Sequence, residues 1–162
     1  MTLKSRLLTG TIAAGALAAI TGCAALGIGG TADPRWADYK AWALVENGQT
    51  GDPTGFIGNV HRGPEGYRNV LVNDIGLETI KSADKDRSFP VGSVIVKEQY
   101  KNKAAWEAGT GAAVTVSVKV EDDKWGWADS LTDSAGDSAF CQGCHTIAAS
   151  HDFMFTGGGY GQ

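Results

Sequence analysis

Two cysteines and a histidine lie within residues 141–145, in the order C-Q-G-C-H. On a helical turn, positions three and four apart share one face, so both thiols and the imidazole would project the same way. Two thiols at this spacing can add to the two vinyl groups of one porphyrin while the imidazole reaches its iron, as in c-type haem attachment. The spacing therefore predicts one covalently bound haem c, held by Cys141 and Cys144, with His145 as the proximal ligand of the iron.

A C-x-x-C pair has two other common uses, as a thiol redox pair and as half of a zinc site. The chain has three cysteines, so no second pair is present to complete a zinc site. A histidine directly after the second cysteine is unusual for a thiol oxidoreductase. Asp137 and Ser138 precede the motif and would cap a short helix there, because their side chains can accept from the first backbone N–H groups. Haem attachment remains the favoured interpretation.

The N-terminal stretch is typical of an export signal. Lys4 and Arg6 form a positive start, and residues 7–20 form an apolar run that is too short to span a membrane convincingly. The run ends in residues 20–23, I-T-G-C, which resemble a bacterial lipobox. We predict a lipoprotein signal peptide over 1–22, a flexible tether over 23–32 and one haem domain over 33–162. An ordinary secretory signal with an incidental Cys23 is the alternative.

Export and haem attachment support each other, because c-type haem is attached outside the bacterial cytoplasm. The expected location is the periplasmic side of a bacterial membrane, most simply the outer membrane, held by acyl groups on Cys23. The chain of 162 residues has a net charge of −4 and no conspicuous Lys/Arg cluster, which argues against a nucleic-acid partner. With only one cysteine outside the motif, a disulfide framework is excluded within the domain.

The hydrophobic periodicity predicts an α+β domain, an antiparallel β-sheet core with packed helices and a C-terminal haem-binding CxxCH helix. Alternating valines over residues 114–120 indicate a strand with one buried and one wet face. An aromatic stripe between Asp33-Pro34 and Asn47-Gly48 predicts a helix between these two boundaries. Further elements are expected as strands over 67–72, 93–98 and around Trp125 and Trp127, and as a short helix over 75–82 capped by Asp74.

Several of these segments together resemble the cytochrome P460 family. The resemblance rests on the stretches 70–74 and 89–98, the Trp125/Trp127 strand, and the 141–145 motif followed by Asp152-Phe153, and it spans roughly 36–156. It implies an antiparallel sheet with packed helices, usually a homodimer, and a high-spin haem with one open face. Its name-giving members oxidise hydroxylamine and carry a lysine covalently bonded to the porphyrin. Relatives called cytochrome c′-β lack that bond and bind gases such as nitric oxide.

Lys97 stands where the resemblance places the cross-linking lysine. By strand alternation its side chain shares a partly apolar face with Val91, Ser93 and Ile95. A lysine must lie close to the macrocycle and be neutral at least transiently to attack it. The alternative is a solvated lysine near a strand end, with Glu98 beside it. The resemblance favours proximity to the haem, and the covalent bond itself is a separate question.

The sixth coordination position distinguishes electron transfer from chemistry at the iron. Met154 lies nine residues beyond His145, too near in sequence to cross easily to the opposite haem face, and it is better explained as core filler. His151 has the same difficulty, and His61 lies in a polar turn. The sequence therefore predicts an open distal site.

A distal carboxylate a few residues before the haem motif handles protons in hydroxylamine-oxidising relatives. Here Gly136 occupies that neighbourhood, between Asp133 and Asp137, which are the acid/base candidates. We expect an oxidoreductase that oxidises hydroxylamine at a five-coordinate haem and passes electrons to a redox partner cytochrome. The first alternative is a non-enzymatic binder of nitric oxide or another small gas ligand, and the weaker alternative is an electron-transfer cytochrome.

Overall fold

The computed structural model describes residues 31–49, 65–82 and 87–156, and the fold is given for these ranges. The signal peptide, Cys23, most of the tether and His61 lie outside the described residues. Within the described ranges, the structure contains no helix with the length and apolar character needed to cross a membrane.

A five-stranded antiparallel sheet forms the centre of the domain, with the strands in sequence order. Its strands are β1 (Ala43–Gln49), β2 (Tyr67–Val72), β3 (Val94–Tyr100), β4 (Ala113–Glu121) and β5 (Lys124–Ala128). Neighbouring strands in an antiparallel sheet can be joined by short connections, and β4 and β5 form a hairpin around a positive-φ residue, Asp123 (φ 56°). The expected α+β class with an antiparallel sheet is confirmed.

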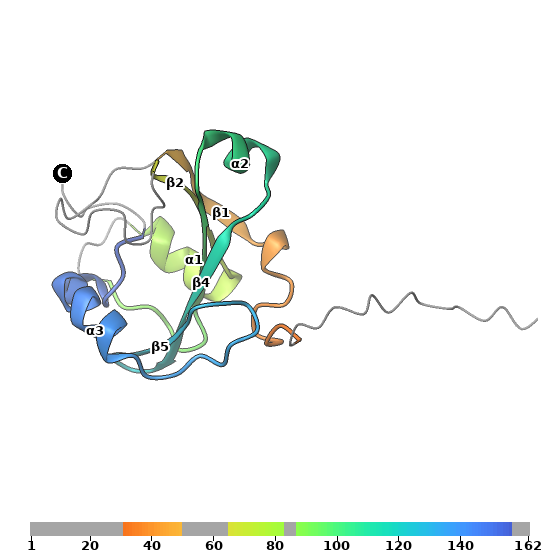
Figure 1. Cartoon of the computed structure of the whole chain (residues 1–162). Coiled ribbons are helices and arrows are strands. Elements are labelled where there is room, and N and C mark those ends of the chain that lie inside the picture. The colour runs from red at the N-terminus through yellow and green to blue at the C-terminus, as the bar shows by residue number, and fades with distance from the viewer. Residues whose placement is uncertain (1–30, 50–64, 83–86, 157–162) are drawn as a thin grey trace, which may run out of the picture.

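Short helices surround this sheet. They are η1 (Tyr39–Ala41), α1 (Asp74–Lys81), α2 (Lys103–Ala108), α3 (Ala139–His145) and η2 (Thr146–His151). In Figure 1, α3 lies near β5 at one end of the sheet and α2 at the opposite end. The haem motif therefore falls on a helix that packs beside the last strand.

The two faces of the sheet bury separate apolar clusters. On the η1 face, Trp36 and Tyr39 pack on the buried valines that β3 and β4 place on that side. On the α3 face, Trp125, Trp127 and Met154 pack on Val70, with Cys141 at the edge of the same cluster. Strand alternation sends successive residues to opposite faces, so β2, β3 and β5 each contribute to both clusters.

The predicted strands over 67–72, 93–98 and 114–120 are present as β2, β3 and β4. The short helix before β3 is also present as α1, but Asn73 rather than Asp74 caps it, because the Asn73 side chain accepts from the Gly76 N–H at 3.1 Å.

The prediction of a helix between Asp33-Pro34 and Asn47-Gly48 is wrong. Only residues 39–41 form a helical turn, and 43–49 form β1, which pairs with β2. The aromatic stripe reflects burial rather than helix: Trp36 and Tyr39 anchor the chain on the η1 face before it enters the sheet. Backbone pairing with a neighbouring strand outweighs local helical periodicity here.

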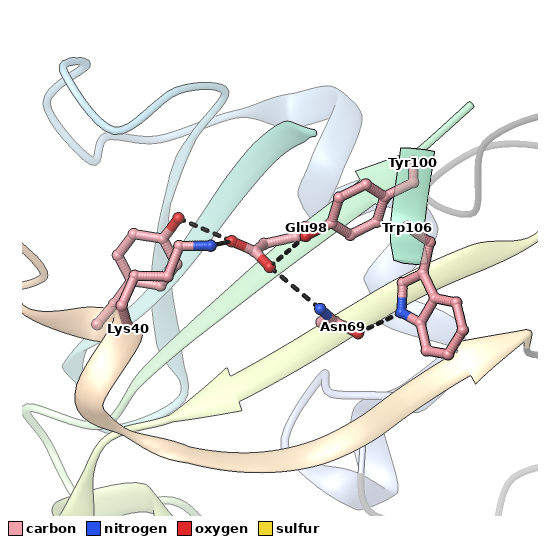
Figure 2. Close-up of polar contacts among 6 residues, drawn as sticks. Lys40, Asn69, Glu98, Tyr100 and Trp106 are labelled. Atoms are coloured by element: carbon pink, nitrogen blue, oxygen red, sulfur yellow. Dashed lines mark hydrogen bonds and ion pairs between the residues drawn. The ribbon is translucent and has the colours of Figure 1, made fainter. Parts of the chain in front are cut away.

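A buried carboxylate, Glu98, connects β3 to its neighbours on the η1 face, and the residue is 2% exposed. The Tyr39 and Tyr100 hydroxyls each donate to it at 2.8 Å, the Asn69 amide at 3.3 Å, and Lys40 forms an ion pair with it. Figure 2 shows Lys40 and Tyr100 approaching the carboxylate from opposite sides. Burial alone would raise the pKa of Glu98, but these donors outweigh it and lower the pKa.

Replacing Glu98 with alanine is expected to lower the free energy of unfolding by about 3 kcal/mol, because two buried hydroxyls lose their acceptor. Since the pKa of Glu98 is lowered on folding, its contribution is present above the unfolded carboxyl pKa of about 4.3 and is lost as the pH falls through the folded value. Urea unfolding at pH 7 and at lower pH measures both effects. Equal stability of the Glu98→Ala and wild-type proteins at pH 7 would contradict this account.

Candidate functional site

The motif residues Cys141, Cys144 and His145 lie on the helix α3. Ser138 caps it, since its hydroxyl accepts from the Cys141 N–H at 3.2 Å. Cys141 and Cys144 are both half-buried, and their thiols are free rather than joined. His145 is buried at the end of the helix, with 7% of its surface exposed.

The orientation of the His145 ring is set by the chain that follows the helix. Its Nδ1 lies 2.5 Å from the carbonyl oxygen of Phe153. A carbonyl only accepts, so Nδ1 carries the proton and the lone pair of the neutral ring is on Nε2. The Trp127 and Phe155 rings lie 4.4 Å and 5.2 Å from the imidazole, centroid to centroid. This hydrogen bond to a backbone carbonyl is the usual device that fixes the tautomer of a metal-binding histidine.

The electrostatics favour the neutral, ligating form of His145. Burial lowers its pKa to about 4, the Phe153 carbonyl opposes that shift, and the nearby Lys97 adds to it. Two free thiols and a neutral imidazole on one helical turn form the donor set that haem c requires, so the residues present fit that group.

A small cavity lies between α3 and the sheet. Lys97, Thr115 and Asp129 line it from the sheet side, and Cys141 and His145 line it from the helix. Lys97 pairs with Val70 of β2 and Thr115 of β4, which places it on the α3 face. The expected apolar face of Lys97 is confirmed: Val70 and Ile95 belong to the cluster packed beneath α3.

Lys97 is half-buried, and its pKa is lowered to about 7. Desolvation is the main cause, and the Arg68 guanidinium lowers the pKa further, whereas Glu46 and Cys141 raise it. Arg68 is itself paired with Glu46, its Nη2 and Nε lying 2.6 Å and 2.9 Å from the carboxylate. A lysine in this environment is substantially neutral near pH 7, as a nucleophilic amine must be.

The two carboxylates predicted to act as acid and base lie away from this cavity. Asp133 is exposed, and Asp137 is exposed and lies 3.5 Å from Lys124. Gly136 is held to β5 by a backbone pair with Trp127. The structure instead brings Asp129, which follows β5 directly, to the cavity that Lys97 and His145 line. Its place at the end of the Trp125/Trp127 strand was the available sequence signal.

The other potential iron ligands occupy structural positions. Met154 is 3% exposed and packs in the α3-face cluster, as expected of core filler. His151 is half-buried and its Nδ1 lies 3.0 Å from the Ser150 hydroxyl. His61 lies outside the described residues.

Comparison with known proteins assigns the chain to a family. The family model described as Cytochrome P460 matches residues 36–156, which is well over half of the 162 residues and includes Lys97, Asp129 and the whole haem motif. A comparison with curated proteins found no match. The family implies a haem cofactor with its iron, for which the donor set on α3 is suited. The chain belongs to the cytochrome P460 family.

Proposed function

We propose that the protein is a mono-haem c-type cytochrome that oxidises hydroxylamine and passes the electrons to a partner cytochrome. Cys141 and Cys144 would form the two thioether bonds, and His145 would bind the iron through Nε2. The haem, when bound, supplies an iron that can bind a small nitrogen compound and accept its electrons. The observation that carries the proposal is the position of Lys97, with its lowered pKa, in the same cavity as Cys141 and His145.

The surrounding residues suit this chemistry in three ways. Lys97 places a neutral nitrogen nucleophile beside the attachment residues, where a bond to the macrocycle would alter the electronic properties of the iron. Asp129, an exposed residue, is part of the lining of the same cavity, and its carboxylate is the proposed acceptor of a proton that hydroxylamine loses on oxidation. Buried Trp127 lies against His145 and restricts the access of water to that side of the imidazole.

Binding of nitric oxide without turnover, as in cytochrome c′-β, is the second candidate. The exposed positions of Asp133 and Asp137 favour it, because neither predicted proton acceptor adjoins the cavity. The sheet, the helix α3 and the donor set would serve either function equally. Lys97 and Asp129 are the residues on which the two functions differ.

The absorption spectrum of the purified ferrous protein separates these candidates. A strongly red-shifted Soret band, with hydroxylamine-dependent reduction of an added electron acceptor, supports the proposal. An ordinary c-type spectrum with nitric oxide binding and no turnover supports the second candidate. A sharp low-spin spectrum would contradict both, because it indicates a strong protein ligand at the sixth position.

We also propose that the protein is a homodimer held on the periplasmic side of a bacterial membrane by lipid on Cys23. The family supports the dimer, and the lipobox-like residues 20–23 support the anchor. Size-exclusion chromatography with light scattering measures the dimer. One acyl chain gives only reversible binding, so stable anchoring requires more than one.

Changing Cys23 to serine is expected to move the protein from the membrane fraction to the soluble periplasmic fraction while its haem content stays the same. The physical reason is that serine cannot form the thioether to which the lipid is attached. Fractionation and mass spectrometry of the mature N-terminus measure the result. A mature wild-type protein that begins at another residue, without acyl chains, would contradict the prediction.

A further inference from the structure

A buried ion pair on the α3 face connects β4 to the chain that follows η2. Lys119 of β4 and Asp152 are 1% and 5% exposed, and their Nζ and Oδ1 atoms lie 2.5 Å apart. The Asp152 carboxylate also accepts from the Phe89 N–H at 2.8 Å and from the Trp125 indole at 3.4 Å. Donors from β4, β5 and the segment before β3 therefore converge on one carboxylate in the chain that follows η2.

This carboxylate stabilises an unusual turn. Asp152 and Phe153 have φ values of 52° and 65°, in the left-handed region that side chains other than glycine rarely adopt. The Phe153 N–H donates to the Ala148 carbonyl at 2.8 Å, and Met154 beyond it is buried. Two successive left-handed residues are unfavourable on their own, so interactions elsewhere must hold them. The buried carboxylate supplies such interactions.

The turn matters because it aims the Phe153 carbonyl at His145. That oxygen lies 2.5 Å from the His145 Nδ1, and the carbonyl direction is fixed by the backbone angles of Phe153. A side chain that holds Asp152 therefore acts on His145 through one backbone group. Neither Lys119 nor Asp152 lines the cavity that Lys97, Cys141 and His145 share.

We propose that Lys119 and Asp152 are positioning residues for the proximal histidine: their ion pair holds the 152–153 turn so that the Phe153 carbonyl accepts from His145 Nδ1. The proposal rests on the proposed function in one respect, that His145 binds the iron. A hydrogen bond at the second ring nitrogen of a ligating histidine fixes its tautomer and raises its basicity. The ion pair would therefore strengthen the iron–histidine bond and lower the reduction potential.

The test compares wild-type protein with the Asp152→Asn and Asp152→Ala variants. Asparagine tolerates the left-handed conformation and keeps one acceptor, whereas alanine removes every side-chain contact. Resonance Raman of the ferrous protein should show the iron–histidine stretching frequency falling in the order wild type, Asn variant, Ala variant, and the reduction potential rising in that order. Exchange of the His145 Nδ1 proton with solvent, followed by NMR of the ferrous carbon monoxide complex, should accelerate roughly tenfold in the Ala variant, about the factor for one hydrogen bond.

Glu98→Gln is the matched control, since Glu98 is an equally buried carboxylate on the opposite face of the sheet. It should lower the stability without changing the Raman frequency, the potential or the exchange rate. If the control shifts them as the Asp152 variants do, the effect is general loosening and the proposal is overturned. If the Ala variant does not fold, the Asn variant decides: wild-type frequency and potential in that variant overturn the proposal.

Failure of the proposed function would be recognised separately. If the purified full chain carries no haem, NMR of ¹⁵N-histidine-labelled protein still reports the His145 tautomer. An Nδ1-protonated ring in wild type that becomes a tautomer mixture in Asp152→Asn supports the positioning role. The same tautomer in both proteins overturns that role, whatever the protein binds.

Discussion

Replacing Lys97 with alanine is expected to convert a red-shifted spectrum into an ordinary c-type one and to lower hydroxylamine turnover more than haem content. The amine lines the cavity with Cys141 and His145, whereas the thioether attachment depends only on the two cysteines. A loss of roughly 10- to 100-fold in turnover is expected, the range for groups that adjoin a metal centre. Intact mass, absorption spectra and hydroxylamine-dependent reduction of an electron acceptor measure the three consequences.

Two matched variants sharpen this experiment. Lys97→Arg keeps a long basic side chain, but its guanidinium, unlike the Lys97 amine, stays protonated and cannot serve as the nucleophile. It should therefore behave like the alanine variant in mass and spectrum. Lys103→Ala removes an exposed lysine of α2 and should leave all three readouts unchanged. If wild type and Lys97→Ala have the same spectrum and neither oxidises hydroxylamine, Lys97 has no role at the haem. Binding of nitric oxide without turnover is then the favoured function.

The lowered pKa of Lys97 also predicts a dependence on pH. With a pKa of about 7, the neutral amine becomes the major form as the pH rises above that value. A bond from this nitrogen to a porphyrin carbon replaces one N–H and one C–H bond and releases two protons and two electrons. With an added two-electron oxidant such as a peroxide, the bond should therefore form faster at pH 8 than at pH 6. Because the folded pKa is below the unfolded lysine value of about 10.4, the unfolded chain binds more protons between these two values. The stability contributed at this site should therefore rise with pH from about 7 to about 10, and Lys97→Met should remove that rise.

The strands of the sheet could be predicted where apolar and polar side chains alternate along the sequence. The alternating valines of β4 predict one buried face, and that period holds in the structure. The predicted wet face is wrong: Thr115 and Ser117 are half-buried and Lys119 is buried, because the chain around α3 and η2 covers that side of the strand. The capping residues before the motif were a local signal, and α3 begins directly after Ser138 as they indicate. The face on which Lys97 lies follows from the same alternation.

The errors arise where the structure depends on distant partners. Residues 43–49 carry a helix-like stripe, but their backbone groups pair with β2, about twenty residues later in sequence. Asp129 was missed because its proximity to Lys97 depends on how β3, β4 and β5 pair. The Lys119–Asp152 pair, 33 residues apart, is likewise visible only once β4 and the chain after η2 are packed together.

Changing both Cys141 and Cys144 to alanine is expected to abolish haem attachment through the motif, the largest effect of any substitution considered. Each thioether needs one thiol, and α3 presents both as free groups on the helix that ends at His145. Protein from cells that express the maturation machinery should lose the haem stain of its polypeptide band on a denaturing gel. The single variants Cys141→Ala and Cys144→Ala should each retain one bond and some stain.

The double variant also tests Lys97 independently of the spectrum. If the Lys97 amine bonds to the macrocycle, some haem should survive denaturation in the double variant and disappear when Lys97→Ala is added. Complete loss of stain in the double variant would mean that Lys97 forms no bond without prior thioether attachment. The control is Ser138→Ala, which removes the helix cap but neither thiol, so it should cost about 1 kcal/mol of stability and keep the stain. A wild-type band without haem would contradict covalent attachment altogether, because haem held by thioether bonds stays on the polypeptide when the protein is denatured.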